Sequence, residues 1–178
     1  MAPKLRSSSA RNQEKEGSER TAWSRVLIQQ YQRYEELGWC IVPWLLVLAD
    51  AAIAVAIVLK VAYTEIDWVA YMQEVAGFLE NNETNYYNLK GDTGPLVYPG
   101  GFVWIFSLLY NLTKKGTDIR LAQWIFLAVY LLTLLLVLGL YRRSRLAPLY
   151  VLPCLILSKR LHSIFMLRMF NDGLAMCL

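Results

Sequence analysis

The sequence predicts an all-α, polytopic membrane protein, and three observations support this prediction. Of its 178 residues, 56% are hydrophobic and the mean hydropathy is positive, which is too apolar for an ordinary soluble domain of this length. The apolar residues are gathered into blocks rather than spread along the chain. The longest block exceeds the roughly 20 helical residues that cross a hydrocarbon core of about 30 Å.

Three apolar blocks are expected to reach or approach the length of a span: residues 39–63, 95–112 and 121–141. The second is short and is interrupted by Pro99-Gly100-Gly101. A fourth block, residues 146–157, is only about half a span long and contains two prolines, so we expect it to be broken, tilted or re-entrant. Because a further apolar run starts at Gly173 without a polar boundary after it, we expect a portion of a longer membrane protein, incomplete at the C-terminus.

The first 38 residues are polar, and we expect them to form a disordered cytosolic tail before a transmembrane domain over residues 39–178. They contain more Lys and Arg than Asp and Glu, and basic residues favour the cytosolic side of a membrane. The loop after the first span, about residues 64–94, would then lie on the lumenal side. It holds six acids, one base and a glycosylation sequon at Asn82, which agrees with that placement.

The membrane side of the later residues stays open in the sequence. If residues 95–112 cross the membrane, the basic cluster of residues 142–145 falls on the lumenal side, against the positive-inside rule. Either residues 95–112 do not span, or the basic cluster is an exception to the rule.

The most informative short segment is Thr64-Glu65-Ile66-Asp67-Trp68, which places two carboxylates where the first span meets the loop. From Glu65 to Glu80 apolar residues recur at helical spacing, so we expect an amphipathic helix with its aromatic side among the lipid headgroups. Thr64 and Asp67 have the spacing of a capping box, which is one interpretation of the segment. The other is a general base, because a carboxylate facing a water-poor site can accept a proton from a sugar hydroxyl.

Two further polar sites lie in apolar surroundings. Asp50 falls near the middle of the first span, where an ionisable side chain is expected to face a partner inside a helix bundle. Arg168 can bind a phosphate or a hydroxyl network, or it can pair with Asp172 at i,i+4 spacing, and the residues leave both open. Asp92-Thr93-Gly94 matches the catalytic triplet of aspartic proteases, but the preceding apolar strand and the second copy that those enzymes need are missing.

Five short blocks follow one another in a specific order. They are residues 64–68, Tyr71-Met72, residues 91–99, residues 116–120, and His162-Ser163-Ile164-Phe165 through Arg168 to Asn171-Asp172. Together they resemble the dolichyl-phosphate-mannose-dependent alpha-1,3-mannosyltransferases of the asparagine-linked glycosylation pathway. The resemblance runs from about Trp39 to Leu178.

The resemblance implies a C-type glycosyltransferase fold with its active site in the first lumenal loop, in a multi-pass protein of the endoplasmic reticulum membrane with a cytosolic N-terminus. Such an enzyme transfers mannose, with inversion, from dolichyl-phosphate mannose to the five-mannose dolichyl-diphosphate oligosaccharide. It works at the lipid bilayer, uses no metal or other cofactor, and has no nucleic acid as a partner.

The family's loop carboxylate corresponds to Asp67, with Glu65 as the fallback base. The candidates for contacts to the phosphate and the sugars are Asp92, Tyr98, His162, Arg168, Asn171 and Asp172. Family members are much longer than this chain, and their later helices are expected to help enclose the two substrates. We therefore expect that the chain needs those helices for activity.

The alternative class is a non-enzymatic transporter or assembly subunit, with Asp50 and Arg168 as relay or pairing groups inside the membrane. Transport favours polar residues aligned along several spans. The central parts of the second and third blocks, residues 102–109 and 125–138, carry almost no polar residues, only Ser107 and Thr133. Because the polar residues gather in the loop instead, the pattern favours chemistry at the membrane interface.

Overall fold

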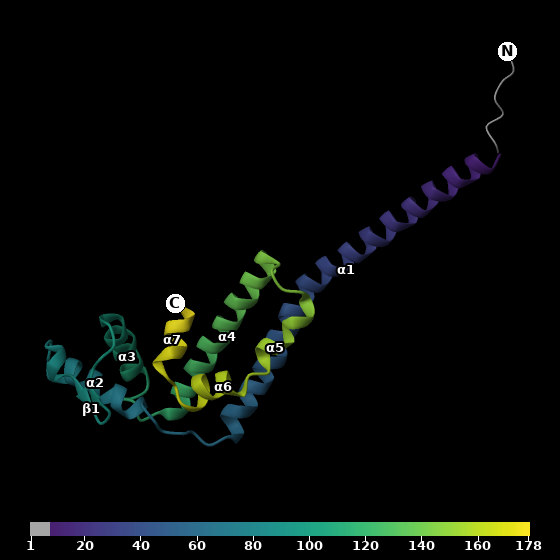
Figure 1. Ribbon diagram of the computed structural model, residues 1–178. Helices are drawn as coiled ribbons and strands as arrows, with labels where there is room; N and C mark the ends of the chain where they lie inside the picture. Colours follow the sequence, from purple (N-terminus) through teal and green to yellow (C-terminus); the bar gives the residue numbers. More distant parts are fainter. Residues whose placement is uncertain (1–7) are drawn as a thin grey trace, which may run out of the picture. The chain divides into compact units, whose positions relative to one another are not determined.

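A computed structural model of the chain describes residues 8–178, with side chains for Arg25 and residues 27–178 (Figure 1). The chain divides into two compact units at Val42 and Pro43, and one helix, α1 (Ser8–Lys60), contributes to both. Residues 8–38 are therefore helical where the sequence predicted a disordered tail, while residues 1–7 lie outside the described part. This stretch is rich in Arg, Glu and Gln, whose side chains lose little rotamer freedom in a helix.

Within residues 8–178, two helices are long and apolar enough to cross a membrane. They are α1, over Leu27–Lys60, and α4 (Ile119–Ser144), and they correspond to the predicted spans over residues 39–63 and 121–141. At the start of α4 the Asp118 carboxylate accepts the Leu121 N–H, which satisfies one of the free donors of a helix N-terminus. At its end, Arg145 adopts the left-handed conformation that commonly terminates a helix.

The block over residues 95–112 forms α3 (Gly100–Leu112), which does not qualify as a span. Its 13 residues extend about 20 Å, well short of the roughly 30 Å of a hydrocarbon core. The guanidinium of Arg120, at the start of α4, donates to the carbonyl of Val58 near the end of α1. The end of α1 and the start of α4 therefore meet, and by length α3 falls short of the two candidate spans on either side of it in the sequence.

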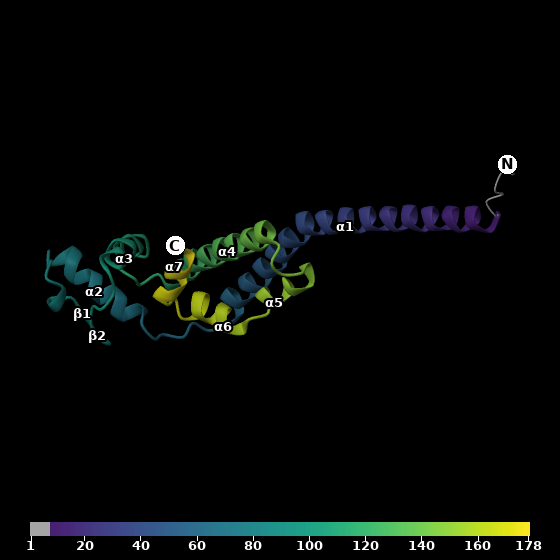
Figure 2. The same ribbon diagram turned by 45° about the horizontal axis from the view of Figure 1, so that its top comes forward.

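After α4 the chain forms a series of short helical pieces. They are η2 (Leu149–Val151), α5 (Pro153–Ile156), α6 (Lys159–His162), the π-helix η3 (Ser163–Leu167) and α7 (Asn171–Cys177). The pair Leu149–Ile156 and Lys159–Leu167 is bent by 41°, as in a broken span or a re-entrant loop, which confirms the prediction of an interrupted segment. The last helix, α7, packs along α4 (Figure 2).

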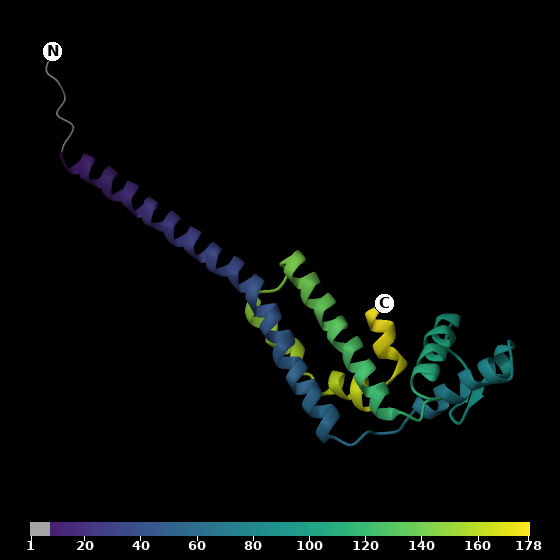
Figure 3. The ribbon, with the colours of Figure 1, turned by 180° about the vertical axis from the view of Figure 1, so that it is seen from behind.

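In the sequence, a small loop unit lies between α1 and α4, and Figure 3 shows it from behind. It contains α2 (Trp68–Glu80), η1 (Tyr86–Asn88), α3, and an antiparallel hairpin of β1 (Lys90–Gly91) and β2 (Gly94–Pro95), a small exception to the all-α prediction. Its buried core includes Trp68, Tyr71, Met72, Val75, Leu89, Leu96, Phe102, Phe106, Phe126 and Met169. The aromatic side of α2 thus packs against protein, and its predicted place among lipid headgroups is wrong.

Candidate active site

The turn that leads into α2 places Asp67 at the helix N-terminus without forming the predicted capping box. Asp67 is the N-cap residue, but its side chain makes no capping hydrogen bond. Thr64 lies too far before Trp68, the first helical residue, to cap the helix, and its backbone N–H donates to the Leu167 carbonyl over 3.0 Å. Because the helix begins later than a Thr64 cap requires, the capping prediction is wrong.

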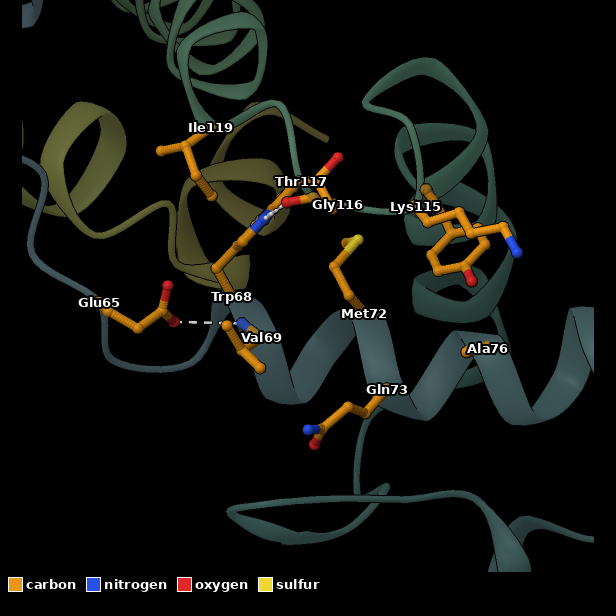
Figure 4. A pocket seen from close by; sticks show the side chains of 11 residues that line it. Glu65, Trp68, Val69, Met72, Gln73, Ala76, Lys115, Gly116, Thr117 and Ile119 are labelled. Atoms are coloured by element: carbon orange, nitrogen blue, oxygen red, sulfur yellow. Dashed lines mark hydrogen bonds between the residues drawn. The ribbon is translucent and has the colours of Figure 1, made fainter.

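Glu65 supplies the contact to the helix start instead. Its Oε1 accepts the backbone N–H of Val69 over 3.1 Å, and its Oε2 accepts the Tyr63 hydroxyl over 2.6 Å (Figure 4). Burial, followed by the hydrogen bond to Glu65, raises the pKa of the Tyr63 hydroxyl above its ordinary value. Both oxygens of Glu65 are therefore held by neighbours, which fixes the carboxylate in place.

The Asp67 carboxylate differs from that of Glu65 in being free. It is half-buried, and within the part of the chain that the structure describes it accepts no hydrogen bond. Its position at the first turn of α2 brings it to the same helix face as Glu74, because residues seven apart differ by only about 20° around a helix. An unengaged carboxylate at the edge of a buried core has the properties that a general base needs.

Glu74 is an acid on α2 that the structure buries. Its side chain is 3% exposed, and Oε2 has no hydrogen-bond partner among the described residues. Burial, followed by the negative charge of Asp67, raises the pKa of Glu74 from its ordinary value of 4.5 to about 7. The hairpin strand β1 packs on the same helix.

Tyr71 connects three distant parts of the chain on the helix that carries Asp67. Its hydroxyl lies 3.2 Å from that of Tyr98, and the backbone of Asn171 is close enough to act on the pKa of the Tyr71 hydroxyl. The Tyr71 ring meets Phe102 edge-on, and Tyr98 stacks on Phe102 with ring centroids 4.7 Å apart. Tyr98 and Asn171, two of the predicted substrate contacts, are thereby brought to the α2 face next to the Asp67 turn.

Asp92 holds the hairpin to α2. Its backbone N–H donates to Gln73 Oε1 over 2.7 Å, and its Oδ2 accepts from Gln73 Nε2 over 2.9 Å. Next to it, a Cβ added to Gly91 would lie 2.5 Å from the Ala70 carbonyl oxygen, so the close approach of hairpin and helix requires glycine. The Asp92 side chain is exposed, with one carboxylate oxygen engaged by Gln73.

An open cavity of about 580 Å³ lies along α2 beside the turn between α3 and α4 (Figure 4). Glu65 stands at one end of it, and Trp68 lines the side where its indole N–H donates to the Gly116 carbonyl over 3.0 Å. Lys115 stands at the other end, 2.7 Å from the carboxylate of Glu80. Asp67 is not among the lining residues, so this cavity belongs to the Glu65 side of the turn.

The buried acid Asp50 has partners on two other helices, as the sequence predicted for an ionisable residue in a span. It is 0% exposed and accepts the Tyr130 hydroxyl over 2.5 Å. The Nε2 of His162 lies 2.8 Å from its other oxygen, while His162 Nδ1 lies 2.9 Å from the Ser158 carbonyl. Since both nitrogens of His162 are engaged inside the bundle, this side chain has no free nitrogen for a substrate.

Arg168 does not form the i,i+4 pair with Asp172 that was one of the two sequence alternatives. The backbone leaves the helical path between them, because η3 ends at Leu167 and Met169 has a positive φ of 49°. The Arg168 guanidinium lies 5.9 Å from the centroid of the Phe170 ring instead. Arg168 and Asp172 both line a second cavity, of about 450 Å³, with Lys159.

The predicted site residues therefore fall into separate groups. Tyr98 and Asn171 meet next to the Asp67 turn, and Arg168 and Asp172 share a cavity, while Asp92 and His162 hold other parts of the structure. Sequence reasoning missed Glu74, although its i+7 spacing from Asp67 was a usable signal. Among the residues that the structure describes, no group of three or more His, Cys, Asp or Glu is placed to hold a metal ion.

Comparison with known proteins gives consistent results. The family model described as ALG3 protein matches residues 44–178. The chain is 53% identical over 150 residues, 84% of its length and 31% of the relative's, to the Drosophila melanogaster protein named dolichyl-P-Man:Man5GlcNAc2-PP-dolichol alpha-1,3-mannosyltransferase l(2)not2. It is 50% identical over 161 residues, 88% of its length and 35% of the relative's, to the Homo sapiens Dol-P-Man:Man(5)GlcNAc(2)-PP-Dol alpha-1,3-mannosyltransferase. It thus spans about a third of the length of these relatives, and no solved structure matches it. The chain belongs to the ALG3 protein family.

Proposed function

We propose that this chain carries the catalytic loop of an inverting alpha-1,3-mannosyltransferase with a C-type glycosyltransferase fold. The enzyme moves mannose from dolichyl-phosphate mannose to the five-mannose dolichyl-diphosphate oligosaccharide during assembly of the N-glycan precursor. The names of the relatives support this reaction, since each describes such a transfer. The observation on this chain that supports it best is the free Asp67 carboxylate where a spanning helix meets the loop unit.

The proposed location is the endoplasmic reticulum membrane, with the N-terminus in the cytosol and the loop unit in the lumen. Because α3 is too short to span, α4 starts on the side where α1 ends and returns to the other side at Arg142 and Arg143. The basic residues before the first span and those at the end of α4 then share one face of the membrane. This arrangement agrees with the positive-inside rule.

In the proposed reaction, Asp67 acts as the general base. Its carboxylate accepts the proton of the acceptor's attacking hydroxyl, and the oxygen forms a bond to the anomeric carbon of the donor mannose. The bond from that carbon to the phosphate oxygen breaks, and dolichyl phosphate leaves with the electron pair. Attack from the face opposite the leaving group turns a beta-linked donor into an alpha-linked product. Glu65 is the weaker candidate, because both of its oxygens are already engaged.

The other predicted residues take different parts in this proposal. Tyr98 and Asn171, which meet at Tyr71, are placed to contact a sugar that reaches Asp67. Arg168 and Asp172 line a separate cavity, where cationic groups suit a phosphate. Asp92 and His162, proposed from the sequence as substrate contacts, are assigned to support: one fixes the hairpin and the other the bundle.

The proposal is tested by measuring mannose transfer by the full-length protein, with dolichyl-phosphate mannose and the five-mannose lipid acceptor. The comparison includes Asp67→Asn, Glu65→Gln, and Glu83→Gln, an acid elsewhere in the loop that contacts Asn85 and Asn88, as a matched control. We expect transfer by the wild type and by Glu83→Gln and little transfer by Asp67→Asn. A wild type that transfers no mannose contradicts the proposed reaction. Normal transfer by Asp67→Asn means that a residue other than Asp67 is the general base.

A further inference from the structure

An apolar cavity of about 450 Å³ lies between the end of α1 and the broken segment α5–α6. One wall consists of Ile53 and Ile57 of α1 and of Val61 directly after it, which lie four residues apart and therefore share one side. Across from them lie Ile156 and Leu157. Several of these side chains are exposed, among them Ile53 at 42% and Leu157 at 70%. The cavity is thus a hydrocarbon-lined groove that follows the second half of a spanning helix.

A second cavity, also of about 450 Å³, adjoins the first and has the opposite character. The two share Lys159 and Ser163 in their linings. The second adds Arg160 and Arg168, so three cationic side chains converge on it. None of the three forms an ion pair with another described residue, and the Arg168 guanidinium lies 5.9 Å from the centroid of the Phe170 ring. Because the cavity holds three cations, one carboxylate and no ion pair between described residues, it favours an anionic ligand.

The segment that presents these cations is fixed on three sides. His162 bonds to Asp50 of α1, the Met166 carbonyl accepts from Gln123 of α4 over 2.9 Å, and the Leu167 carbonyl accepts from Thr64. π-Helices such as η3 are rare in proteins, and those that occur are often found at functional sites. The backbone under the basic cavity is therefore fixed by hydrogen bonds, which reduces the conformational entropy lost when a ligand binds.

We propose that these two cavities form the anchoring site of the lipid acceptor, with the isoprenoid chain in the apolar groove and the diphosphate on Lys159, Arg160 and Arg168. This inference rests on the proposed function, which supplies an acceptor of this class. The apolar groove runs beside a membrane-spanning helix, and the cations begin where it ends, so their order matches that of a lipid tail followed by phosphates.

Charge favours the acceptor over the donor for this site. Three cations and the single carboxylate of Asp172 leave a net charge of about +2 in the basic cavity. A diphosphate linked at both ends carries two negative charges near neutral pH, whereas the phosphate of the mannosyl donor, also linked at both ends, carries one. The acceptor's attacking hydroxyl is several sugars away from its diphosphate, so an anchoring site apart from Asp67 suits it.

The test measures binding of dolichyl diphosphate, dolichyl phosphate and uncharged dolichol to the protein in lipid nanodiscs, without any mannose transfer. The variants are Arg168→Gln, the double variant Lys159→Ala with Arg160→Ala, and Ile57→Trp, which fills the groove. The matched control is Arg142→Ala with Arg143→Ala, two cations in the last turn of α4. Thermal unfolding of each variant identifies any that fail to fold.

We expect the wild type to bind dolichyl diphosphate at least about tenfold more tightly than dolichyl phosphate, and to bind dolichol weakest. Each cation variant weakens diphosphate binding about tenfold or more and narrows the preference over phosphate. If Ile57→Trp folds, it binds both dolichyl diphosphate and dolichyl phosphate more weakly, and the control variant changes neither affinity. Equal affinity for phosphate and diphosphate, or full binding by a folded Arg168→Gln, overturns the acceptor site.

Failure of this inference is distinguishable from failure of the proposed function. If the wild type transfers mannose but the variants bind dolichyl diphosphate normally, the anchoring site is contradicted and the proposed reaction is not. If the wild type binds dolichyl diphosphate through these cations but transfers no mannose, the proposed reaction is contradicted and the binding site is not.

Discussion

The imidazole Nε2 of His162 lies 2.8 Å from Oδ1 of Asp50, which precedes it by 112 residues. The same carboxylate accepts the Tyr130 hydroxyl, so α1, α4 and α6 meet at one acid. Asp50 is fully buried inside a spanning helix, where an unpaired ionised group has a high free energy. This pairing connects the spanning helices to the segment that carries the cationic cavity.

Removing the buried acid therefore destabilises the bundle. We expect Asp50→Ala to lower the free energy of unfolding by about 3–5 kcal/mol, because His162 and Tyr130 lose their shared partner. Denaturant unfolding in mixed micelles measures the change. Thr133→Val is the control, since the Thr133 hydroxyl bonds only within its own helix, to the Val129 carbonyl. A loss below about 1 kcal/mol for Asp50→Ala contradicts the assigned pairing.

Glu74 makes the stability of the loop unit depend on pH. Because its pKa is raised from 4.5 to about 7, the folded state binds the proton more tightly than the unfolded state does. Stability is then highest below pH 4.5, falls as the pH rises from 4.5 to 7, and is level above 7. At about 1.4 kcal/mol per pKa unit, we expect roughly 1–3 kcal/mol to be lost over this range.

Thermal unfolding at pH 5 and pH 8 checks this dependence in the wild type and in Glu74→Gln. The amide cannot ionise, so we expect the variant to gain stability over the wild type at pH 8 and to gain much less at pH 5. The control is Glu83→Gln, whose carboxylate is held by Asn85 and Asn88 and has a lowered pKa. If Glu74→Gln and the wild type respond equally to pH, the burial of an acid at this position is wrong.

The contact between hairpin and α2 depends on the glycine at residue 91. In Gly91→Ala the new Cβ would lie 2.5 Å from the Ala70 carbonyl oxygen, and backbone on both sides would have to move. We expect a loss of about 1–3 kcal/mol in the free energy of unfolding. Gly101→Ala is the matched control, because its Cβ meets nothing within 4 Å and alanine favours a helix by about 1 kcal/mol. Equal effects of the two substitutions would show that the hairpin does not pack on α2.

The proposed orientation is checked by labelling cysteines in sealed microsomes with a membrane-impermeant maleimide. In a cysteine-free background, Glu83→Cys lies in the loop unit and Arg143→Cys at the far end of α4. We expect Arg143→Cys to react in intact microsomes and Glu83→Cys to react only after permeabilisation. Reaction of both residues from the same side would mean that α4 does not cross.

The sequence was sufficient where a local property decides the structure. Residues 121–141 lie in a helix long and apolar enough to span, because apolar length is a local property. The predicted interruption after them is also present: Pro148 precedes η2, Pro153 begins α5, and the segment bends between Ile156 and Lys159. For Asp50 the chemistry of a charge in a span predicted that a partner exists. It did not identify His162, because contacts across 112 residues leave no trace in periodicity.

Other features depend on packing that no local pattern records. Glu74 carries an ionisable side chain, yet the packing around α2 leaves it only 3% exposed. The aromatic side of α2 suited a membrane surface as well as a protein core, and α3 and α4 supply the core. The capping box failed because α2 begins at Trp68 with Asp67 as its N-cap residue, while the Thr64 backbone N–H pairs with the distant Leu167 carbonyl.

The assignment of Asp67 as the general base is tested most directly by the rate of mannose transfer by Asp67→Asn in the full-length protein. Loss of a general base reduces kcat by about 10²–10⁴-fold, and since the amide keeps the shape of the side chain, the KM for dolichyl-phosphate mannose should hardly change. We predict that result, with Glu65→Gln retaining far more activity. A kcat for Asp67→Asn within about threefold of the wild type contradicts the assignment.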